Sequence, residues 1–527
     1  MMVRKSYEDM SSEEVFHRVC VADFWETTAH YSRVQFDPIL TPLFAGIFAN
    51  AGITGSFFGL GLANTLGSLA TAIVTTAVTT GLQMLLAPKP PKPEDGKAPM
   101  TQAVPPCIWG VGTTRMAGAF MLWEAVGSKL YSVQAIAAHP ITRYNRFWLH
   151  DDEVTIGVDG AVNNLNGRYG GKTNIFTRLG AVPETPYAEF VADLATQSIW
   201  TTNHRGDGQA SVALLAKTPK AKDYTSKFPY GIPRLTVEAD LAKVWDFRDP
   251  AQSATNPATW TFSKNPILQL CWHWCFNEFG HLKDYTKAIL PVLDMWIEEA
   301  DICDEFVVLA GGGTERRYTC SGWDTTDREP KVGTNSILAA CDGWICQRGD
   351  GALLVTVGKF RESRVVTLTD ADILGHNVAY DTLPEEEINR LVPKFNYPDT
   401  DYSTSDTDFF EDVAAQLVAG RVLAEEMNLQ WVTSWTQARR LAWREWQRIQ
   451  QKIKGSLNVG LPGINAVYAR WIRLATPVRL PKLNGSLIEN RRAVIDLMKG
   501  GFSVDIVKHP SDIDNWTTAM EGQKPPV

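Results

Sequence analysis

One segment constrains this chain more than any other: no charged side chain occurs between Pro38 and Pro88. Its length allows two membrane-spanning helices of about 20 residues each, joined near Asn64 or Gly67. Closely spaced glycines suit tight packing of one helix against another. We therefore predict an apolar helical hairpin over residues 38–88, buried either in a membrane or at the axis of an oligomer. A Gly/Ala-rich core hairpin of a soluble domain remains the alternative.

The segments beside this run differ sharply from it in composition. Residues 1–37 form an N-terminal region of mixed charge, unlike the short basic start of a secretory signal peptide. Residues 89–103 open with KPPKPEDGKA, which predicts an extended, Pro-rich linker. The eight cysteines follow no regular spacing, so reduced thiols in a cytosolic assembly environment are expected.

The remaining chain predicts an α+β, multi-domain protein. With 527 residues the chain exceeds what one core supports. Residues 104–264 show β alternation and form a first β-rich domain, residues 265–345 a helical or α+β domain, and residues 346–527 a second β-rich domain. Within residues 265–345, Arg317–Cys320 is expected to be a strand. The 18 tryptophans indicate large cores or buried interfaces, with a sugar-binding cleft as the alternative.

A helix is predicted over residues 435–453, inside the second β-rich domain. Its apolar stripe is formed by Ala438, Leu441, Ala442, Glu445, Ile449 and Ile453. The other side carries Arg439, Arg440, Arg444 and Arg448. We expect these arginines to lie on a solvated face or to contact a neighbouring ring of an assembly, and not to bind nucleic acid.

No catalytic, cofactor-binding or metal-binding residue is predicted. The stretch Gly167–Thr173 nearly matches a phosphate-binding loop but has Asn166 where the first glycine is needed. Cys271 and Cys275 lie one helical turn apart, and buried, inert thiols are expected there because zinc needs four ligands. Carboxylates at 298, 299, 301, 304 and 305 allow a glycosidase pair in principle, but none of them is singled out.

The formal charge of −8 also excludes one class of protein, the basic nucleic-acid binders. An acidic surface instead suits a protein past which DNA moves without adhering.

The order of motifs between Ser263 and Val366 resembles the tip attachment protein J family, the central tail-tip proteins of long-tailed bacteriophages. Similar features are a helix after Asn265-Pro266, a helix ending Cys303-Asp304-Glu305, and the stretch Arg317–Cys320. The stretch 245–249 (WDFRD) and the stretch 436–442 (TQARRLA) also resemble the family. A second resemblance links residues 85–118 to the small tail assembly protein I, as though the two proteins were fused.

The resemblance implies a homotrimeric, non-enzymatic tail hub at the distal tip of a virion. It would close the tail tube and open for DNA ejection. Its partners would be the distal tail protein, other tail-tip rings, the tape measure protein, and tail fibres or receptor-binding proteins. Residues 38–88 would then be a lumen plug able to reach the host membrane. Longer relatives continue beyond the position of Val527, which leaves receptor binding by this chain open. The alternatives are an integral membrane protein of the host with a soluble β-rich domain and a cell-wall-degrading tail enzyme.

Overall fold

The computed structural model describes residues 99–101, 104–164, 167–381, 387–496 and 500–526. Contacts within the chain divide it into residues 1–92 and residues 93–527. The predicted N-terminal region 1–37 and apolar hairpin 38–88 lie outside the described residues, as does most of the linker 89–103. Among the residues that are described, no helix is long and apolar enough to cross a membrane. The described part is α+β and rich in separate sheets, as the sequence predicts.

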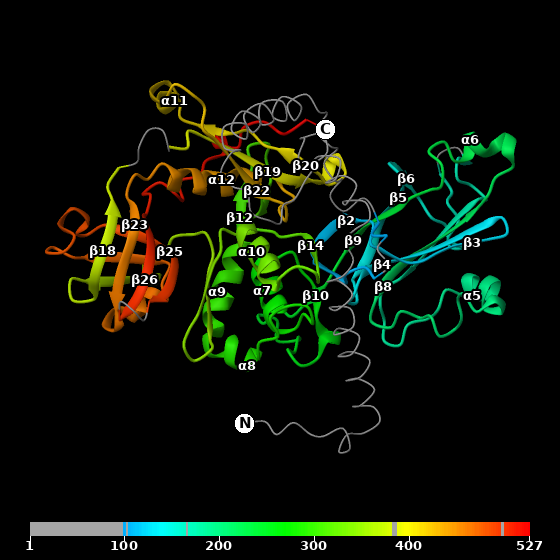
Figure 1. Ribbon diagram of the computed structural model, residues 1–527, viewed down its shortest axis with the longest axis horizontal. Coiled ribbons are helices and arrows are strands. Elements are labelled where there is room, and N and C mark those ends of the chain that lie inside the picture. Colours follow the sequence, from blue (N-terminus) through cyan, green and yellow to red (C-terminus); the bar gives the residue numbers. More distant parts are fainter. Residues whose placement is uncertain (1–98, 102–103, 165–166, 382–386, 497–499, 527) are drawn as a thin grey trace, which may run out of the picture. The chain divides into compact units, whose positions relative to one another are not determined.

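Two four-stranded sheets make up the first β-rich region (Figure 1). One has the order β3-β4-β8-β7 and the other β2-β9-β5-β6. Their bounds are Thr113–Met116 (β2), Ala119–Val126 (β3), Lys129–Ala137 (β4), Arg143–Leu149 (β5), Asp152–Val154 (β6), Thr173–Arg178 (β7), Ala210–Lys217 (β8) and Leu235–Asp240 (β9).

Strand β8 shows how the first of these sheets is buried on both faces. Val212 and Leu214 belong to the core shared with β9, while Ala213 and Leu215 pack with Phe190 of helix α5 (Ala188–Leu194). Because side chains alternate along a strand, a strand covered on both sides reads as one continuous apolar run. The sequence ASVALLA of β8 is such a run.

The middle region contains several helices, and short strand pairs lie around them. Its helices are α7 (Pro266–Cys275), α8 (Tyr285–Ala288), α9 (Leu293–Asp304) and α10 (Pro330–Ala340), while the short helix α6 (Tyr224–Lys227) lies between β8 and β9 of the first β-rich region. The pairs are β1 (Ile108–Val111) with β14 (Gly322–Thr325), β10 (Lys243–Val244) with β11 (Thr261–Phe262), β12 (Phe306–Val308) with β13 (Thr314–Arg316), and β15 (Trp344–Gln347) with β16 (Leu353–Thr356).

Helix α7 begins where the sequence indicates. Asn265 is its N-cap, accepting a hydrogen bond from the Ile267 amide, and Pro266 occupies the first turn. The helix packs against α9 and α10 around Trp296, which is fully buried. The same core includes Trp109 and Trp431, so it draws on residues before position 264 and after position 345.

The expectation of a strand at Arg317–Cys320 is wrong. Strand β13 ends at Arg316 and β14 begins at Gly322, and the residues between them are irregular. Their backbone bonds go to separate partners: the Tyr318 amide donates to the Cys303 carbonyl and the Cys320 amide to the Lys264 carbonyl. The β-branched and aromatic composition fits a buried segment, but no neighbouring strand continues the ladder.

The last region contains a six-stranded sheet of order β17-β24-β25-β26-β23-β18 and a four-stranded sheet centred on β19. The first contains β17 (Val365–Thr369), β18 (Ile373–Ala379), β23 (Lys454–Gly460), β24 (Trp471–Ala475), β25 (Leu487–Asp496) and β26 (Gly501–Lys508). The second contains β19 (Arg390–Tyr397), β20 (Ser403–Asp406), β21 (Phe410–Glu411) and β22 (Ala424–Leu429). Helices α11 (Val413–Ala419), α12 (Trp435–Ile449) and α13 (Ile464–Val467) complete it.

Helix α12 ends at Ile449 and not at residue 453 as predicted. Gln450 caps the helix, and after it the chain passes into β23, which begins at Lys454. Ile453 still packs against an apolar core, that of the six-stranded sheet, but it does so from the connection between the two elements. Ile453 follows Ile449 by four positions, so its apolar side chain matched the helical repeat although the helix had already ended.

Candidate functional site

The arginines of α12 are the largest departure from the sequence prediction. Arg439, Arg440, Arg444 and Arg448 are each exposed by no more than 6%. The expectation that they form a solvated face or an interface to another ring is therefore wrong. Buried guanidinium groups require charged or hydrogen-bonding partners, and each of the four has them.

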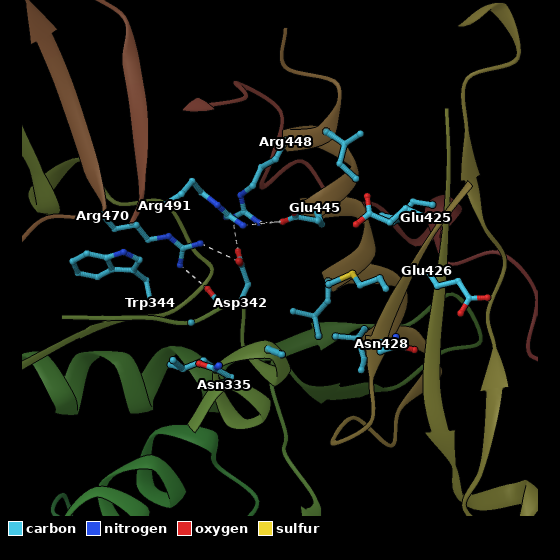
Figure 2. Close-up of a pocket in the computed structure, with 18 of the residues that line it drawn as sticks. Asn335, Asp342, Trp344, Glu425, Glu426, Asn428, Glu445, Arg448, Arg470 and Arg491 are labelled. Carbon is cyan, nitrogen blue, oxygen red and sulfur yellow. Dashed lines mark hydrogen bonds and ion pairs between the residues drawn. The ribbon is translucent and has the colours of Figure 1, made fainter. Parts of the chain in front are cut away.

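Asp342 is the centre of the largest cluster. Its carboxylate accepts hydrogen bonds from Arg444 Nε at 2.6 Å, Arg448 Nη2 at 2.7 Å and Arg470 Nη2 at 3.0 Å; two of these arginines are drawn in Figure 2. Burial alone would raise the pKa of Asp342, but Arg448, Arg470 and Arg444 outweigh it and hold the pKa far below its usual range. Asp342 therefore stays ionised and neutralises part of the cluster.

A second carboxylate, Glu489 of β25, completes the charge balance. Arg448 Nε donates to Glu489 Oε2 at 2.6 Å, and Glu489 is fully buried. Burial would raise the pKa of Glu489, whereas Arg448 and the bond from His509 lower it well below its usual range. Arg444 also pairs with Asp514 of the C-terminal segment. Helix α12 is thus joined by ionic bonds to β25 and to the segment after β26.

The other two arginines of α12 donate hydrogen bonds to backbone carbonyl oxygens of other segments. Arg439 donates to the carbonyl oxygens of Asp408, Met520 and Glu521 at 2.5, 3.0 and 3.2 Å. Arg440 donates to Glu315 and to the carbonyl of Arg317. The irregular stretch after β13 is therefore held by α12 and not by a sheet.

The motifs that carry the family resemblance meet in this same interior. The side-chain nitrogen of Asn265 donates to the Ala300 carbonyl at 2.8 Å and to the Asp304 carboxylate at 2.9 Å, which fixes the end of α9 against the start of α7. Gln437 of α12 accepts from the Thr319 amide at 3.0 Å and donates to the Ala340 carbonyl at 2.8 Å. These residues satisfy buried backbone groups, so their role here is to specify the fold.

The carboxylates at the end of α9 each have a cationic partner. Glu298 and Glu299 pair with Arg361, Asp301 and Asp304 with Arg248, and Glu305 with Arg317 and Lys359. Burial raises the pKa of Glu299, which the Arg361 charge only partly offsets. The arrangement is that of structural ion pairs around the end of α9.

In the described residues, no cluster of three or more metal-binding side chains occurs around the cysteine pair in α7. Cys271 is fully buried, and its pKa is raised by the contact with Cys275 and by burial. That is the inert thiol expected from the sequence. Cys275 is only partly buried.

The glycine-rich stretch 167–173 leads directly into strand β7, which begins at Thr173. A phosphate-binding loop requires a helix at that point, whose N-terminus would face the phosphate. The nucleotide interpretation therefore has no support in the described part, while Asn166 itself lies outside it.

Tryptophan side chains mostly fill cores, as predicted. Ten of them are at most 9% exposed, namely Trp109, Trp148, Trp200, Trp245, Trp260, Trp272, Trp296, Trp431, Trp446 and Trp471.

One cavity of about 470 Å³ opens beside the arginine cluster. Strand β22 forms one wall, and the ends of α10 and α12 form the other (Figure 2). Sequence reasoning missed this site because Asp342, Arg470 and Asn490 come from three separate segments. The available signal was the density of arginine in α12, where four arginines lie between Arg439 and Arg448.

Comparison with known proteins yields no matching family model and no matching curated protein. Among solved structures, the chain is similar to one from the virion of the native gene transfer agent particle, with 15% identity and a TM-score of 0.49 over 86% of this chain and 98% of that chain. It is also similar to the 43 kDa tail protein of prophage MuSo2 from Shewanella oneidensis, with 9% identity and a TM-score of 0.24 over 78% of this chain and 98% of that one.

A third similar structure is the tail protein from Neisseria meningitidis MC58, with 8% identity and a TM-score of 0.27 over 79% of this chain and 99% of that chain. At these identities and TM-scores, the likenesses do not establish a family.

Proposed function

We propose that this chain is a structural protein of a phage-type tail, the central hub at the distal tip that closes the tail tube. The observation that carries the proposal is the place of the motifs behind the family resemblance. Inside one core, the side-chain amide of Asn265 donates to the carbonyl of Ala300, Gln437 accepts from the backbone amide of Thr319, and Arg440 donates to the carbonyl of Arg317. Motifs shared because they specify a fold are expected in a structural component, whereas shared catalytic residues would converge on an open cleft.

In this proposal three copies surround the tube axis and contact the distal tail protein, other tail-tip rings and the tape measure protein. Tail fibres or receptor-binding proteins attach outside. The net charge of −8 keeps DNA from adhering as it passes through the lumen. Residues 38–88, with no charge, fill the lumen as a plug and leave it on opening, because uncharged helices tolerate both a protein interior and a host membrane.

Cryo-electron microscopy of tailed particles purified from cells that produce this chain tests the proposal. The expected result is three copies closing the distal end of the tube. Absence of the chain from purified particles would overturn the proposal and favour an integral membrane protein of the host, which the uncharged run also suits. A peptidoglycan zymogram that shows clearing by the purified chain would instead indicate a cell-wall-degrading enzyme.

The plug has its own test. Deletion of residues 38–88 is expected to give tails that leak DNA or fail to assemble. As a matched control, residues 38–88 are replaced by a Gly/Ser stretch of equal length, which keeps the spacing and removes the apolar side chains. Tails that stay sealed and infectious with either variant would refute the plug while leaving the hub position intact.

A further inference from the structure

Among the described residues, no strand covers the outer edge of strand β22. It pairs in parallel with β19 over Ala424 to Leu429, while β20 and β21 lie on the other side of β19. In the described part of the chain, no strand pairs with the outer side of β22. An edge of this kind presents backbone N–H and C=O groups that can pair with a further strand.

The cavity beside α12 runs along this edge. Five consecutive residues line it, from Glu425 through Leu429. Side chains of a strand alternate between two faces, so a cavity lying over one face would be lined by every second residue. Lining by consecutive residues indicates that the backbone edge of β22 borders the cavity. A smaller cavity of about 160 Å³ continues along Asn428 to Val432, with α10 as its opposite wall.

The polar groups of the cavity call for a cation and a hydrogen-bond donor. In Figure 2, Glu425 points from β22 toward Glu445 of α12. Glu425 is exposed and has no ion-pair partner among the described residues, whereas Glu445 is shared by Arg448 and Arg491. Asn490 is 1% exposed; its amide nitrogen donates to three carbonyls, but its Oδ1 accepts no hydrogen bond within the described part.

The nearby arginines do not oppose a cation, because their charge is already balanced. Arg448 and Arg470 are bound by Asp342, and Arg448 also by Glu489. Arg491 lies 3.6 Å from Glu445 and 3.8 Å from Glu489. The carboxylates on β22 also argue against pairing with the same strand of a second copy, since that would place glutamates opposite glutamates.

We propose that this groove binds an extended peptide segment of a partner protein, which adds as a strand to β22 and places a lysine or arginine side chain between Glu425 and Glu445. The backbone of the segment pairs with the free edge of β22, and this supplies most of the affinity. The cationic side chain supplies the specificity. A donor on the segment reaches the unpaired oxygen of Asn490. The proposal does not depend on the position of the chain in a tail.

A random heptapeptide library selected against the full-length chain tests the proposal. The selected peptides are expected to carry lysine or arginine and to lose binding when alternate backbone amides are N-methylated, because N-methylation removes strand hydrogen bonds. Affinity is then measured by fluorescence anisotropy with labelled peptides. Glu425→Lys is expected to weaken binding about fivefold or more, the scale of losing one ion pair and adding one like-charge contact.

Glu124→Lys is the matched control, since Glu124 is an exposed glutamate on another edge strand, β3. It is expected to leave binding unchanged, and circular dichroism checks that both variants fold. Selection of no peptide, equal binding to the Glu425→Lys chain, or indifference to N-methylation would each overturn the proposal.

Discussion

The buried carboxylate of Asp342 offers the sharpest test of the arginine cluster. Asp342→Asn removes the negative charge while keeping the shape of the side chain. Asp342 has a positive φ of 46°, which asparagine tolerates as well as aspartate does. The substitution therefore isolates the electrostatic effect. Three guanidinium groups, those of Arg444, Arg448 and Arg470, lose a shared anion whose side chain is only 13% exposed.

Breaking a buried ion pair by removing one partner costs about 3–5 kcal/mol, because the remaining charge stays buried. Glu489 and Asp514 still compensate two of the three arginines, so the lower end of this range is expected. With a urea m-value of about 3 kcal/mol/M, the midpoint of the transition that unfolds α12 falls by about 1 M. Urea unfolding followed by tryptophan fluorescence measures this shift.

Asp350→Asn is the matched control. Asp350 accepts three hydrogen bonds from Arg348, and Asp342 likewise accepts three from its arginines, but the side chain of Asp350 is 54% exposed. Solvent screening makes such surface pairs nearly neutral in stability, so the urea midpoint is expected to stay at the wild-type value. If Asp342→Asn shifts the midpoint no more than Asp350→Asn does, burial is not what gives the cluster its energy and the reasoning fails.

Three further predictions concern the same interior. Burial lowers the pKa of His273 to about 4 from an ordinary 6.5, so the unfolded chain binds more protons than the folded chain between these two pH values. The stabilising contribution is therefore complete above pH 6.5, and the free energy of unfolding falls by about 3 kcal/mol as the pH drops to 4. Urea titrations at several pH values should show a flatter dependence on pH in His273→Gln. Gln437→Met leaves the Thr319 amide without an acceptor, and a loss of about 1–3 kcal/mol is expected in thermal unfolding, whereas Gln447→Met is expected to leave stability unchanged. Trp296→Ala empties a fully buried site and should cost about 3–5 kcal/mol in urea unfolding; a loss no larger than that of the exposed Trp123→Ala would contradict the core position.

Local signals in the sequence were sufficient for much of the fold. The Asn265-Pro266 pair predicts the start of α7, because the cap and the proline act within one turn. Strand alternation and apolar runs likewise indicate the sheets, since period-2 burial depends on the strand itself. The glycine-rich stretch before β7 could be rejected as a nucleotide site from the residues that follow it.

The candidate site was beyond such reasoning because its partners are distant in sequence. Arg448 and Asp342 are separated by 106 positions, and Arg470 and Asp342 by 128. Helical periodicity assigns residues to faces, but it does not reveal that the face opposite the apolar stripe is also covered. The strand expected at Arg317–Cys320 failed for the same reason, since its backbone partners include Arg440 of α12.

The use of buried arginines in α12 has a structural consequence that an apolar helix would not have. Burying charge gains little stability over well-packed apolar side chains, so the benefit must lie elsewhere. Apolar contacts are non-directional, whereas a guanidinium group bonds only where its fixed fork meets an acceptor. Arg439 requires the carbonyls of the C-terminal segment, and Arg448 requires both Asp342 and Glu489.

Helix α12 therefore fixes the orientation of segments that meet it from several parts of the chain, including the wall of the groove beside β22. Loss of Asp342 should accordingly disturb this groove before it unfolds the protein. In Asp342→Asn, peptide binding to β22 is expected to weaken under conditions where circular dichroism still reports a folded chain. Binding that persists at wild-type affinity until the urea transition would show that the groove is held by β19 alone, and that the arginine cluster has no part in shaping it.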